Sequence, residues 1–498
     1  MKFSIKPTDP AKLETDVLIM FCHEGELNKL PLLNKKLTDL IKEAAVHEGF
    51  EGRKEQFLVL QAKEYIGAYK LLIVGVGKKE ESDLYQVRKC VAEAVKKASH
   101  FQPEQIAFVL PDTWLEKFTI ENVVQAAVEA GVLSSYKFLK YKSSEEKSKI
   151  KEIKEMILSV TAGRLSSAEK GVKLGLLYSE AACFARDLIN EPSTVTTPSY
   201  LAELAQTISK ESKGKVKATI LEKAEIKKLG MNAYLGVSKG SDELPKLIRL
   251  DYNPRYSRKK IAIVGKGITF DTGGLSLKSS EQMEKMKMDM AGAAAVLAVF
   301  KVLPFLNIEA SVVGLIPACE NMVSSRALKP GDIVTAVNGK TIEVLNTDAE
   351  GRLTLADALS YLATKEKPDY MIDLATLTGS CIVALGEEIA GLWSTDRKLT
   401  ERLQKASDNC GEKLWQMPLF EEYKPLIKSD IADFRNTQTG KYAGSITAAL
   451  FLSEFTAFVP WAHLDIAGPA FAEKDSALMP KGGAGFGVRL LLSFLGSI

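Results

Sequence analysis

Short apolar runs alternate with helical patterns along this chain. In its first third, the runs at residues 17–22, 58–62, 71–76 and 106–110 fit buried strands. Residues 85–98 and 121–133 instead repeat apolar side chains at helical spacing. Strands that alternate with helices favour an α/β fold, in which helices pack on the faces of a sheet.

The length of the chain predicts two domains. It has 498 residues, 46% of them hydrophobic, which is enough for two cores. Lys, Ser and Glu dominate residues 141–155, which we interpret as the surface end of a first domain, although such a stretch is often a solvated loop or helix face. Helical periodicity then continues to Pro192, and apolar runs return further on. The sequence predicts a smaller N-terminal α/β domain at 1–160, a linking helix at 161–190 and a larger C-terminal α/β domain at 191–498.

Charge and cysteine content limit the class of protein. Lys and Arg number 66 against 63 Asp and Glu, so the overall balance does not call for nucleic acid or a membrane surface. A local basic patch stays possible. The six cysteines form no CxxC pair, which argues against a disulfide framework and a thiolate zinc site. The longest apolar run, 291–306, contains Lys301 and Pro304, and the N-terminus is not apolar, so we expect a cytoplasmic protein.

Residues 346–353, NTDAEGRL, place two carboxylates and a guanidinium at alternate positions. The preceding residues 341–345 are rich in β-branched and apolar residues and predict a strand. If the chain stays extended, Asp348, Glu350 and Arg352 point the same way, because side chains in a strand repeat every second residue. Two anions and a cation would then face one site.

A second group of charged residues follows the strand predicted at 261–265. It comprises Lys266, Asp271 and Lys278. In open α/β sheets, ligands bind at this carboxyl edge. The glycines around Lys266 would also suit a phosphate-binding loop, but no GxxxxGK[ST] follows and such a loop has no use for Asp271.

Asp289 lies beside the apolar stripe of the helix predicted to follow. A carboxylate there is costly to bury alone, so it pairs with Lys285 or binds a metal. Because four other candidate ligands accompany it, we favour the metal. The chain has four His and no HExxH, so the donors are mainly carboxylates, which suit Mg²⁺, Mn²⁺ or a bridged pair of Zn²⁺ ions. We interpret His463 and Asp465 as structural.

These residues together resemble a known family, the leucyl aminopeptidases of the M17 metallopeptidases, also called cytosol aminopeptidases. Residues 346–353 match the signature octapeptide of that family, and further matches follow the family's order at 185–192, 265–278, 286–290, 373–386 and 461–468. The resemblance covers the chain from about residue 180 onward; the first domain matches only in size and α/β character. It implies a catalytic C-terminal domain with a mixed central sheet.

The resemblance also implies the metal ligands. One ion would be held by Lys266, Asp271, Asp289 and Glu350, and the other by Asp271, Asp348 and Glu350. Two divalent ions, Mn²⁺ or Zn²⁺, would activate the attacking water. The substrates would be peptides with a free N-terminus, with Leu and other apolar residues preferred there.

Two further residues would act on the substrate or the water. By resemblance, Lys278 donates to the developing oxyanion, and Arg352 binds bicarbonate, which acts as general base. Thr376, Leu377 and Gly379 would supply backbone groups and walls of the substrate cleft, although a simple strand-to-helix turn explains them equally well.

Other functions stay open at this point. The family is hexameric, so we expect a homohexamer. Some bacterial members also bind DNA, and the lysines of residues 140–154 could contact phosphates, but glutamates in and beside that stretch reduce its net charge. An inactive binding scaffold and a two-metal phosphatase are the remaining alternatives.

Overall fold

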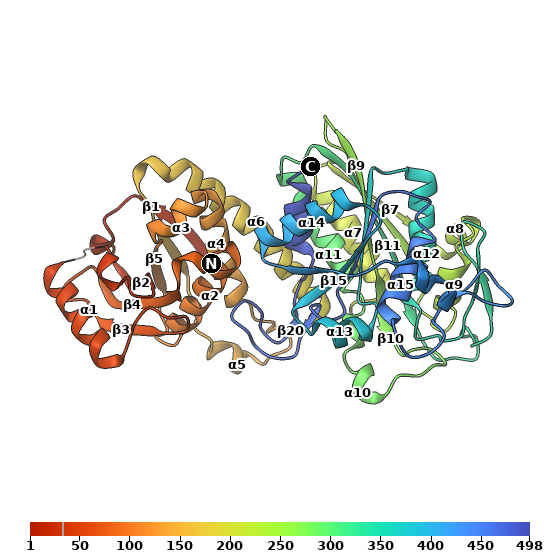
Figure 1. Cartoon of the computed structure of the whole chain (residues 1–498), viewed down its shortest axis with the longest axis horizontal. Helices are drawn as coiled ribbons and strands as arrows, with labels where there is room; N and C mark the ends of the chain where they lie inside the picture. The colour runs from red at the N-terminus through yellow and green to blue at the C-terminus, as the bar shows by residue number, and fades with distance from the viewer. Residues whose placement is uncertain (32–33) are drawn as a thin grey trace. The chain divides into compact units, whose positions relative to one another are not determined.

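The computed structural model describes residues 1–31 and 34–498, which divide into two compact units (Figure 1). Unit 1 comprises Met1–Glu180, Asn409–Gly411 and Asp475–Pro480. Unit 2 comprises Ala181–Asp408, Glu412–Lys474 and Lys481–Ile498. Each unit has its own sheet with helices around it, so the predicted two-domain α/β class is confirmed.

Unit 1 is built on a six-stranded sheet in the order β1-β6-β5-β2-β4-β3. All neighbours are parallel except the antiparallel edge pair of β3 and β4. The four apolar runs of the sequence correspond to β2, β3, β4 and β5. The strands are β1 (Lys2–Lys6), β2 (Thr15–His23), β3 (Phe57–Gln61), β4 (Ala68–Gly77), β5 (Gln105–Val109) and β6 (Glu155–Ser159).

Helices cover both faces of this sheet, which is why its central strands are apolar on both sides. Val17 and Ile19 of β2 pack with α2 and α4, whereas Leu18 and Met20 pack with α1 on the other face. Side-chain caps begin α1, α2, α4 and α5, as where Asn34 accepts from the amide of Leu37. The helices are α1 (Lys35–Glu48), α2 (Leu84–Ser99), α3 (Asp112–Lys117), α4 (Ile120–Ser135), α5 (Ser144–Ser148) and α6 (Leu165–Asn190). The long helix α6 begins in unit 1 and ends in unit 2.

Unit 2 contains a nine-stranded sheet in the order β16-β15-β18-β14-β9-β11-β8-β7, with β10 beside β11. The central strands β18, β14, β9 and β11 are parallel. Strands β8 and β15 join them in antiparallel fashion, and β7 pairs with β8 in antiparallel fashion, so the sheet is mixed as predicted. The strands are β7 (Val216–Leu221), β8 (Lys246–Tyr252), β9 (Lys259–Gly265), β10 (Gly267–Asp271), β11 (Ala310–Asn321), β14 (Tyr370–Ala375), β15 (Ile389–Ser394), β16 (Lys413–Gln416) and β18 (Trp461–Asp465).

Two smaller sheets complete the strands of unit 2. One joins β12 (Ile333–Thr335), β13 (Thr341–Glu343) and β17 (Phe434–Arg435), and the other pairs β19 (Phe471–Ala472) with β20 (Gly482–Gly483). The helices are α7 (Pro198–Glu211), α8 (Lys223–Lys228), α9 (Asn232–Ser238), α10 (Ser280–Met283), α11 (Ala291–Val302), α12 (Gly351–Tyr361), α13 (Gly379–Leu385), α14 (Arg397–Cys410), α15 (Gly444–Ser453) and α16 (Val488–Leu495).

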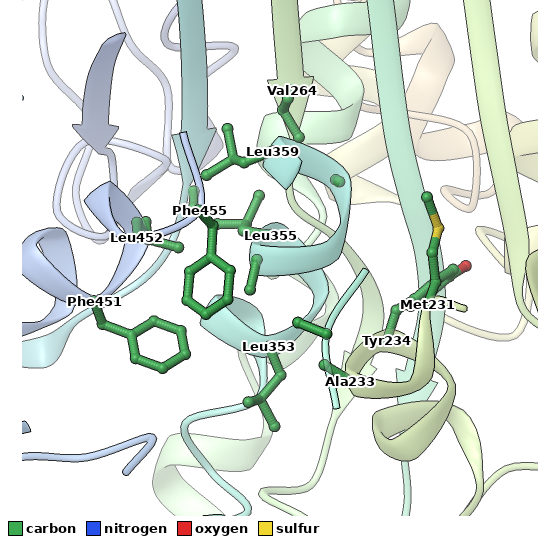
Figure 2. Packing of buried hydrophobic residues seen from close by; sticks show 14 of the residues in the cluster. Met231, Ala233, Tyr234, Val264, Leu353, Leu355, Leu359, Phe451, Leu452 and Phe455 are labelled. Carbon is green, nitrogen blue, oxygen red and sulfur yellow. The ribbon is translucent and has the colours of Figure 1, made fainter. Parts of the chain in front are cut away.

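The core of unit 2 holds α12 against the sheet. Figure 2 shows Leu355 and Leu359 of α12 beside Phe455, which follows α15, with Val264 of β9 close by. All four side chains are buried. On the other face of the sheet, Gly314 of β11 lies against the ring of Phe300 in α11. Helices α12 and α11 are therefore packed on opposite faces of the sheet.

One stretch among the described residues, Ser280–Phe305, is long and apolar enough to cross a membrane by length and composition alone. It contains α10 and α11, and 83% of its apolar window is buried inside the protein. A core helix meets the same criteria, and α11 is such a helix.

Candidate metal centre

The predicted site residues of unit 2 gather where parallel strands end. Strands β9 and β10 run as one line beside β11, interrupted at Lys266. Asp271 is the last residue of β10, and Thr376 follows the end of β14. The backbone amide of Lys266 donates to the carbonyl of Leu374 in β14 (3.0 Å). The site therefore forms at the carboxyl edge of the sheet, where the sequence predicted a ligand.

The octapeptide does not continue as a strand, so the prediction of an extended chain through Arg352 was wrong. Strand β13 ends at Glu343, a turn follows at residues 347–348, and α12 begins at Gly351 with Glu350 as its N-cap. The hydroxyl of Thr347 holds this turn, donating to Gly273 O (2.7 Å) and accepting from Ser276 N (2.8 Å). The carboxylates are therefore brought together by a turn and the start of a helix, and not by the alternation of side chains along a strand.

Asp289 also differs from its predicted position. It lies between a short 3-10 turn, Met286–Met288, and α11, rather than on the face of one continuous helix. Its side chain is nonetheless buried at 3% exposure. It pairs with Lys266 instead of the predicted alternative, Lys285, whose ammonium pairs with Glu473.

Two lysines connect the four carboxylates. The ammonium of Lys266 lies 2.8 Å from Asp289 Oδ1 and 2.7 Å from Glu350 Oε1, and it donates to the carbonyl of Thr376 (2.9 Å). Gly351 makes room for it, because a Cβ there would lie 2.6 Å from Cε of Lys266.

Lys278 connects the other two carboxylates. Its ammonium lies 3.0 Å from Asp271 Oδ2 and also pairs with Asp348 Oδ1. The side chain of Lys278 is 13% exposed, whereas that of Lys266 is 3% exposed. Of the two ammonium groups, that of Lys278 is therefore the one closer to solvent.

Three of the carboxylates are close enough to share one ion. Asp271, Asp348 and Glu350 each offer an oxygen, and these atoms lie within 4.8 Å of one another. Asp289 joins them through Lys266. The structure thus brings together all five residues that were predicted as ligands.

Burial and mutual repulsion set the protonation of this cluster. Burial raises the pKa of Asp271, and the neighbouring charge of Glu350 raises it further. Burial likewise raises the pKa of Asp289 and of Asp348. Although burial opposes the charged form of Lys266, the carboxylates of Asp289, Glu350 and Asp271 outweigh it and raise the pKa of Lys266. Burial therefore disfavours the ionised forms of Asp271, Asp289 and Asp348, and additional positive charge would favour them.

The donor set fits divalent cations. Asp289 Oδ2 and Glu350 Oε2 are buried and have no hydrogen-bond partner in the described chain. Buried carboxylate oxygens are normally bonded, and an oxygen without a partner costs free energy unless an ion binds to it. Carboxylate oxygens near one lysine nitrogen are ligands that Mn²⁺ or Zn²⁺ accepts.

Arg352 is buried in the first turn of α12 with free donor groups. Its Nε and Nη1 atoms have no hydrogen-bond partner in the described chain, and the residue is 6% exposed. Burial lowers the pKa of Arg352 to about 10, so it still carries its charge at neutral pH. A buried guanidinium with free donor groups suits an anion.

Two residues beside the centre were not singled out as partners of the ligands from sequence. Asn321, at the end of β11, donates from Nδ2 to Asp271 Oδ1 (2.8 Å) and to the carbonyl of Thr347 (3.0 Å). The hydroxyl of Thr376 donates to Asp289 Oδ1 (2.6 Å). Asn321 is the last residue of an apolar strand, and Thr376 directly follows one. A polar residue at the carboxyl end of an apolar strand is therefore the sequence pattern that would have predicted both.

Leu377 and Gly379 take part in the turn from β14 to α13. The amide of Leu377 donates to Asp465 Oδ1 (3.3 Å), and Gly379 begins α13. His463 Nδ1 lies 2.6 Å from Asp373 Oδ1, a hydrogen bond between neighbouring strands β18 and β14. These contacts agree with the structural interpretation of His463 and Asp465.

Comparisons with known proteins cover nearly the whole chain. Residues 183–492 match the catalytic domain of the cytosol aminopeptidase family, and residues 17–145 match the N-terminal domain of the same family. A probable cytosol aminopeptidase of Thermosynechococcus vestitus is 44% identical over 100% of both chains. Another, from Alkaliphilus metalliredigens, is 40% identical over 99% of this chain and 98% of that protein.

Solved structures also match nearly the whole chain. A mutant of tomato leucine aminopeptidase superimposes with a TM-score of 0.90 at 33% identity, covering 100% of this chain and 97% of the other. The bottromycin maturation enzyme BotP, solved in complex with Mn, gives 0.84 at 31% identity, covering 97% and 99%. The chain belongs to the cytosol aminopeptidase family of M17 metallopeptidases and is a metallo-aminopeptidase, a hydrolase that acts on peptides.

Proposed function

We propose that this enzyme removes N-terminal amino acids, preferring Leu and other apolar residues, from peptides that have a free N-terminus. The observation that carries the proposal is the buried cluster of Asp271, Asp348 and Glu350, whose oxygens lie within 4.8 Å of one another beside Lys266 and Asp289. We assign the catalytic work to the C-terminal domain, residues 191–498, which contains all of these residues.

The ligand assignment rests on the donor set. One ion would be bound by Lys266, Asp271, Asp289 and Glu350, and a second by Asp271, Asp348 and Glu350. Lys266 would bind as its neutral amine, because adjacent divalent ions would lower the pKa that the carboxylates alone raise. When bound, two such ions acidify a water molecule and polarise the carbonyl of the scissile peptide bond. The unpartnered oxygens of Asp289 and Glu350 support this assignment.

Lys278 is proposed to stabilise the developing oxyanion. Burial opposes its charge, but Asp271 and the other carboxylates outweigh burial and raise the pKa of Lys278, so it remains an ammonium donor. Because its side chain is partly exposed, a substrate oxygen can reach it. A donor aimed at charge that develops only in the transition state raises kcat rather than affinity for the substrate.

Arg352 is proposed to hold bicarbonate, and the buried, unpartnered Nε and Nη1 atoms of its guanidinium support this proposal. A side chain that stays protonated cannot itself accept a proton from the attacking water. Bicarbonate bound there would supply the general base. Thr376 orients Asp289 through its hydroxyl and Lys266 through its carbonyl.

The decisive assay compares Leu-p-nitroanilide with its N-acetylated counterpart, after chelation and again after Mn²⁺ or Zn²⁺ is restored. We expect metal-dependent release from the free-amine substrate alone. A p-nitroanilide series with Leu, Met, Phe, Ala and Glu then tests the apolar preference. Equal release from the acetylated substrate would contradict recognition of the free N-terminus, and no release under either metal would contradict the proposal as a whole.

We also propose a homohexamer in the cytoplasm. Light scattering of the purified protein tests the assembly, which should have six times the 54.5 kDa mass of one chain. DNA binding stays a secondary prediction with little support, because Lys149 pairs with Glu145 and Glu146, and Lys154 pairs with Glu104. A gel-shift titration at two salt concentrations tests it, since phosphate contacts weaken steeply with salt.

A further inference from the structure

Unit 1 contains a cavity of about 760 Å³ outside the carboxyl ends of its parallel strands. The ends of β2 and β5 contribute Met20–His23 and Val109, and the segments that follow β1 and β6 close the other side. All of its lining residues lie within unit 1, whereas the metal centre lies in unit 2. Its volume is within the range of about 300–1,000 Å³ that small-molecule sites occupy.

The cavity lies at the point where the strand order of this sheet reverses. In the order β1-β6-β5-β2-β4-β3, the chain leaves β2 towards β4 on one side and leaves β5 towards β6 on the other. The loops after β2 and β5 therefore diverge and leave a crevice between them. In open α/β sheets, ligands bind in the crevice at such a switch point.

The floor of the cavity is apolar and rigid. Phe21 packs on Trp114 with ring centroids 4.9 Å apart, and Val109 and Leu110 continue the wall. His23, the last residue of β2, connects β4 with α3: its Nδ1 lies 3.0 Å from Gly77 O and its Nε2 lies 2.8 Å from the hydroxyl of Thr113. The floor is thus suited to an apolar group of modest size.

Charged residues of both signs line the rest of the cavity, and they form ion pairs. Lys29 lies 2.6 Å from Glu26, Lys79 lies 2.7 Å from Glu116, and Arg164 lies 3.9 Å from Asp112. In each pair at least one side chain is more than two-fifths exposed. Exposed pairs of this kind contribute little stability, so a ligand can replace one partner at small cost.

The balance of charge decides the class of ligand. Asp9 also lines the cavity, so four carboxylates face three basic groups and a polyphosphate would be repelled. A ligand that carries one charge of each sign can bind a lysine and a glutamate at once. We propose that this cavity binds a free apolar amino acid as its zwitterion, with the side chain on the apolar floor, the carboxylate on Lys79 and the ammonium on the acidic groups.

Calorimetry on the full, Mn²⁺-loaded enzyme tests the proposal with L-leucine as the probe. Thr161 lines the cavity, is exposed and makes no capping hydrogen bond, so Thr161→Trp fills the cavity without disturbing the fold. We expect the wild type to show a binding event that Thr161→Trp lacks, while both hydrolyse Leu-p-nitroanilide equally. Identical isotherms would overturn the site, whatever the activity.

A charge reversal and two truncated probes test the zwitterion. Lys79→Glu should weaken this binding event about tenfold, because one hydrogen bond between charged groups is lost. Lys42→Glu is the control: Lys42 is exposed and lies outside the cavity, so this variant should bind L-leucine as the wild type does. Leucinol lacks the carboxylate and 4-methylpentanoate lacks the ammonium, and neither has an amide bond that the enzyme can hydrolyse, so each should bind at least tenfold more weakly. Equal binding of either probe, or displacement of L-leucine by inorganic phosphate, would overturn the assignment.

Discussion

Among the described residues, each unit buries ionised side chains, but only in unit 2 do some of them lack hydrogen-bond partners. In unit 1, Arg88 and Glu129 are 2% and 0% exposed and lie 2.8 Å apart. Arg88 also donates to Leu84 O, and the other oxygen of Glu129 accepts from Gln125. This pair is balanced in charge and well bonded, as a buried ion pair must be to persist.

The metal centre of unit 2 is built in the opposite way. Four carboxylates face two lysines, and buried oxygens of Asp289 and Glu350 have no partner in the described chain. Burial raises the pKa values of three of the carboxylates. The comparison shows that burial alone does not identify a functional site. Buried charge without hydrogen-bond partners does identify such a site, because the free energy that its burial costs is recovered only when a ligand binds.

The largest effect is expected from Glu350→Ala, which removes a proposed ligand of both ions and the partner of Lys266. Metal content and activity should fall together, with kcat/KM lower by more than about a hundredfold. Metal analysis of the dialysed protein alongside the peptide assay measures both. Glu309→Ala is the matched control, because Glu309 forms only an exposed pair with Arg258. Full metal content in Glu350→Ala would contradict the bridging assignment.

Lys278→Ala should separate catalysis from metal binding within the same cluster. We expect kcat to fall by about 10²–10³, with both ions retained, because an oxyanion donor acts mainly in the transition state. Lys285→Ala is the control, since Lys285 pairs with Glu473 at the surface and should leave kcat unchanged. An unaltered kcat in Lys278→Ala would remove this lysine from the mechanism.

Arg352→Ala should keep the metals and lose the response to bicarbonate. Without the anion that the guanidinium holds, we expect a loss of roughly a hundredfold in kcat, the lower end of what a general base contributes. Arg352→Lys keeps the charge but loses the planar guanidinium, so the activity of this variant should respond only weakly to bicarbonate. The test is to titrate bicarbonate into CO₂-free buffer, and a normal response in Arg352→Ala would refute the assignment.

The smallest effect on activity is expected in unit 1. Arg88→Ala leaves Glu129 buried and unpaired, so the free energy of unfolding should fall by about 3–5 kcal/mol, whereas kcat of the folded enzyme stays unchanged. Urea unfolding and the peptide assay measure the two quantities. Replacing both partners, Arg88→Met with Glu129→Leu, should restore most of the stability. A loss of kcat in that double variant would mean that the balanced pair also serves catalysis.

The chemistry of the site was present in the linear sequence. Strands such as β2, β4, β9 and β14 follow from their apolar runs, because local side-chain pattern decides secondary structure. The position of Lys266 after a buried strand predicted the ligand edge of the sheet, and the octapeptide predicted a carboxylate-rich site. The fold class and the family followed from these residues.

Only the tertiary structure decided how the carboxylates meet. Asp348 and Glu350 converge because Thr347 is tied to Gly273 and Ser276, some seventy residues away in the chain, and this turns a predicted strand into a turn and a helix start. Asn321 and Thr376 reach their carboxylates across comparable separations. Hydrogen bonds between distant segments leave no periodic pattern in the sequence, so local periodicity indicates which side chains are available but not where they point.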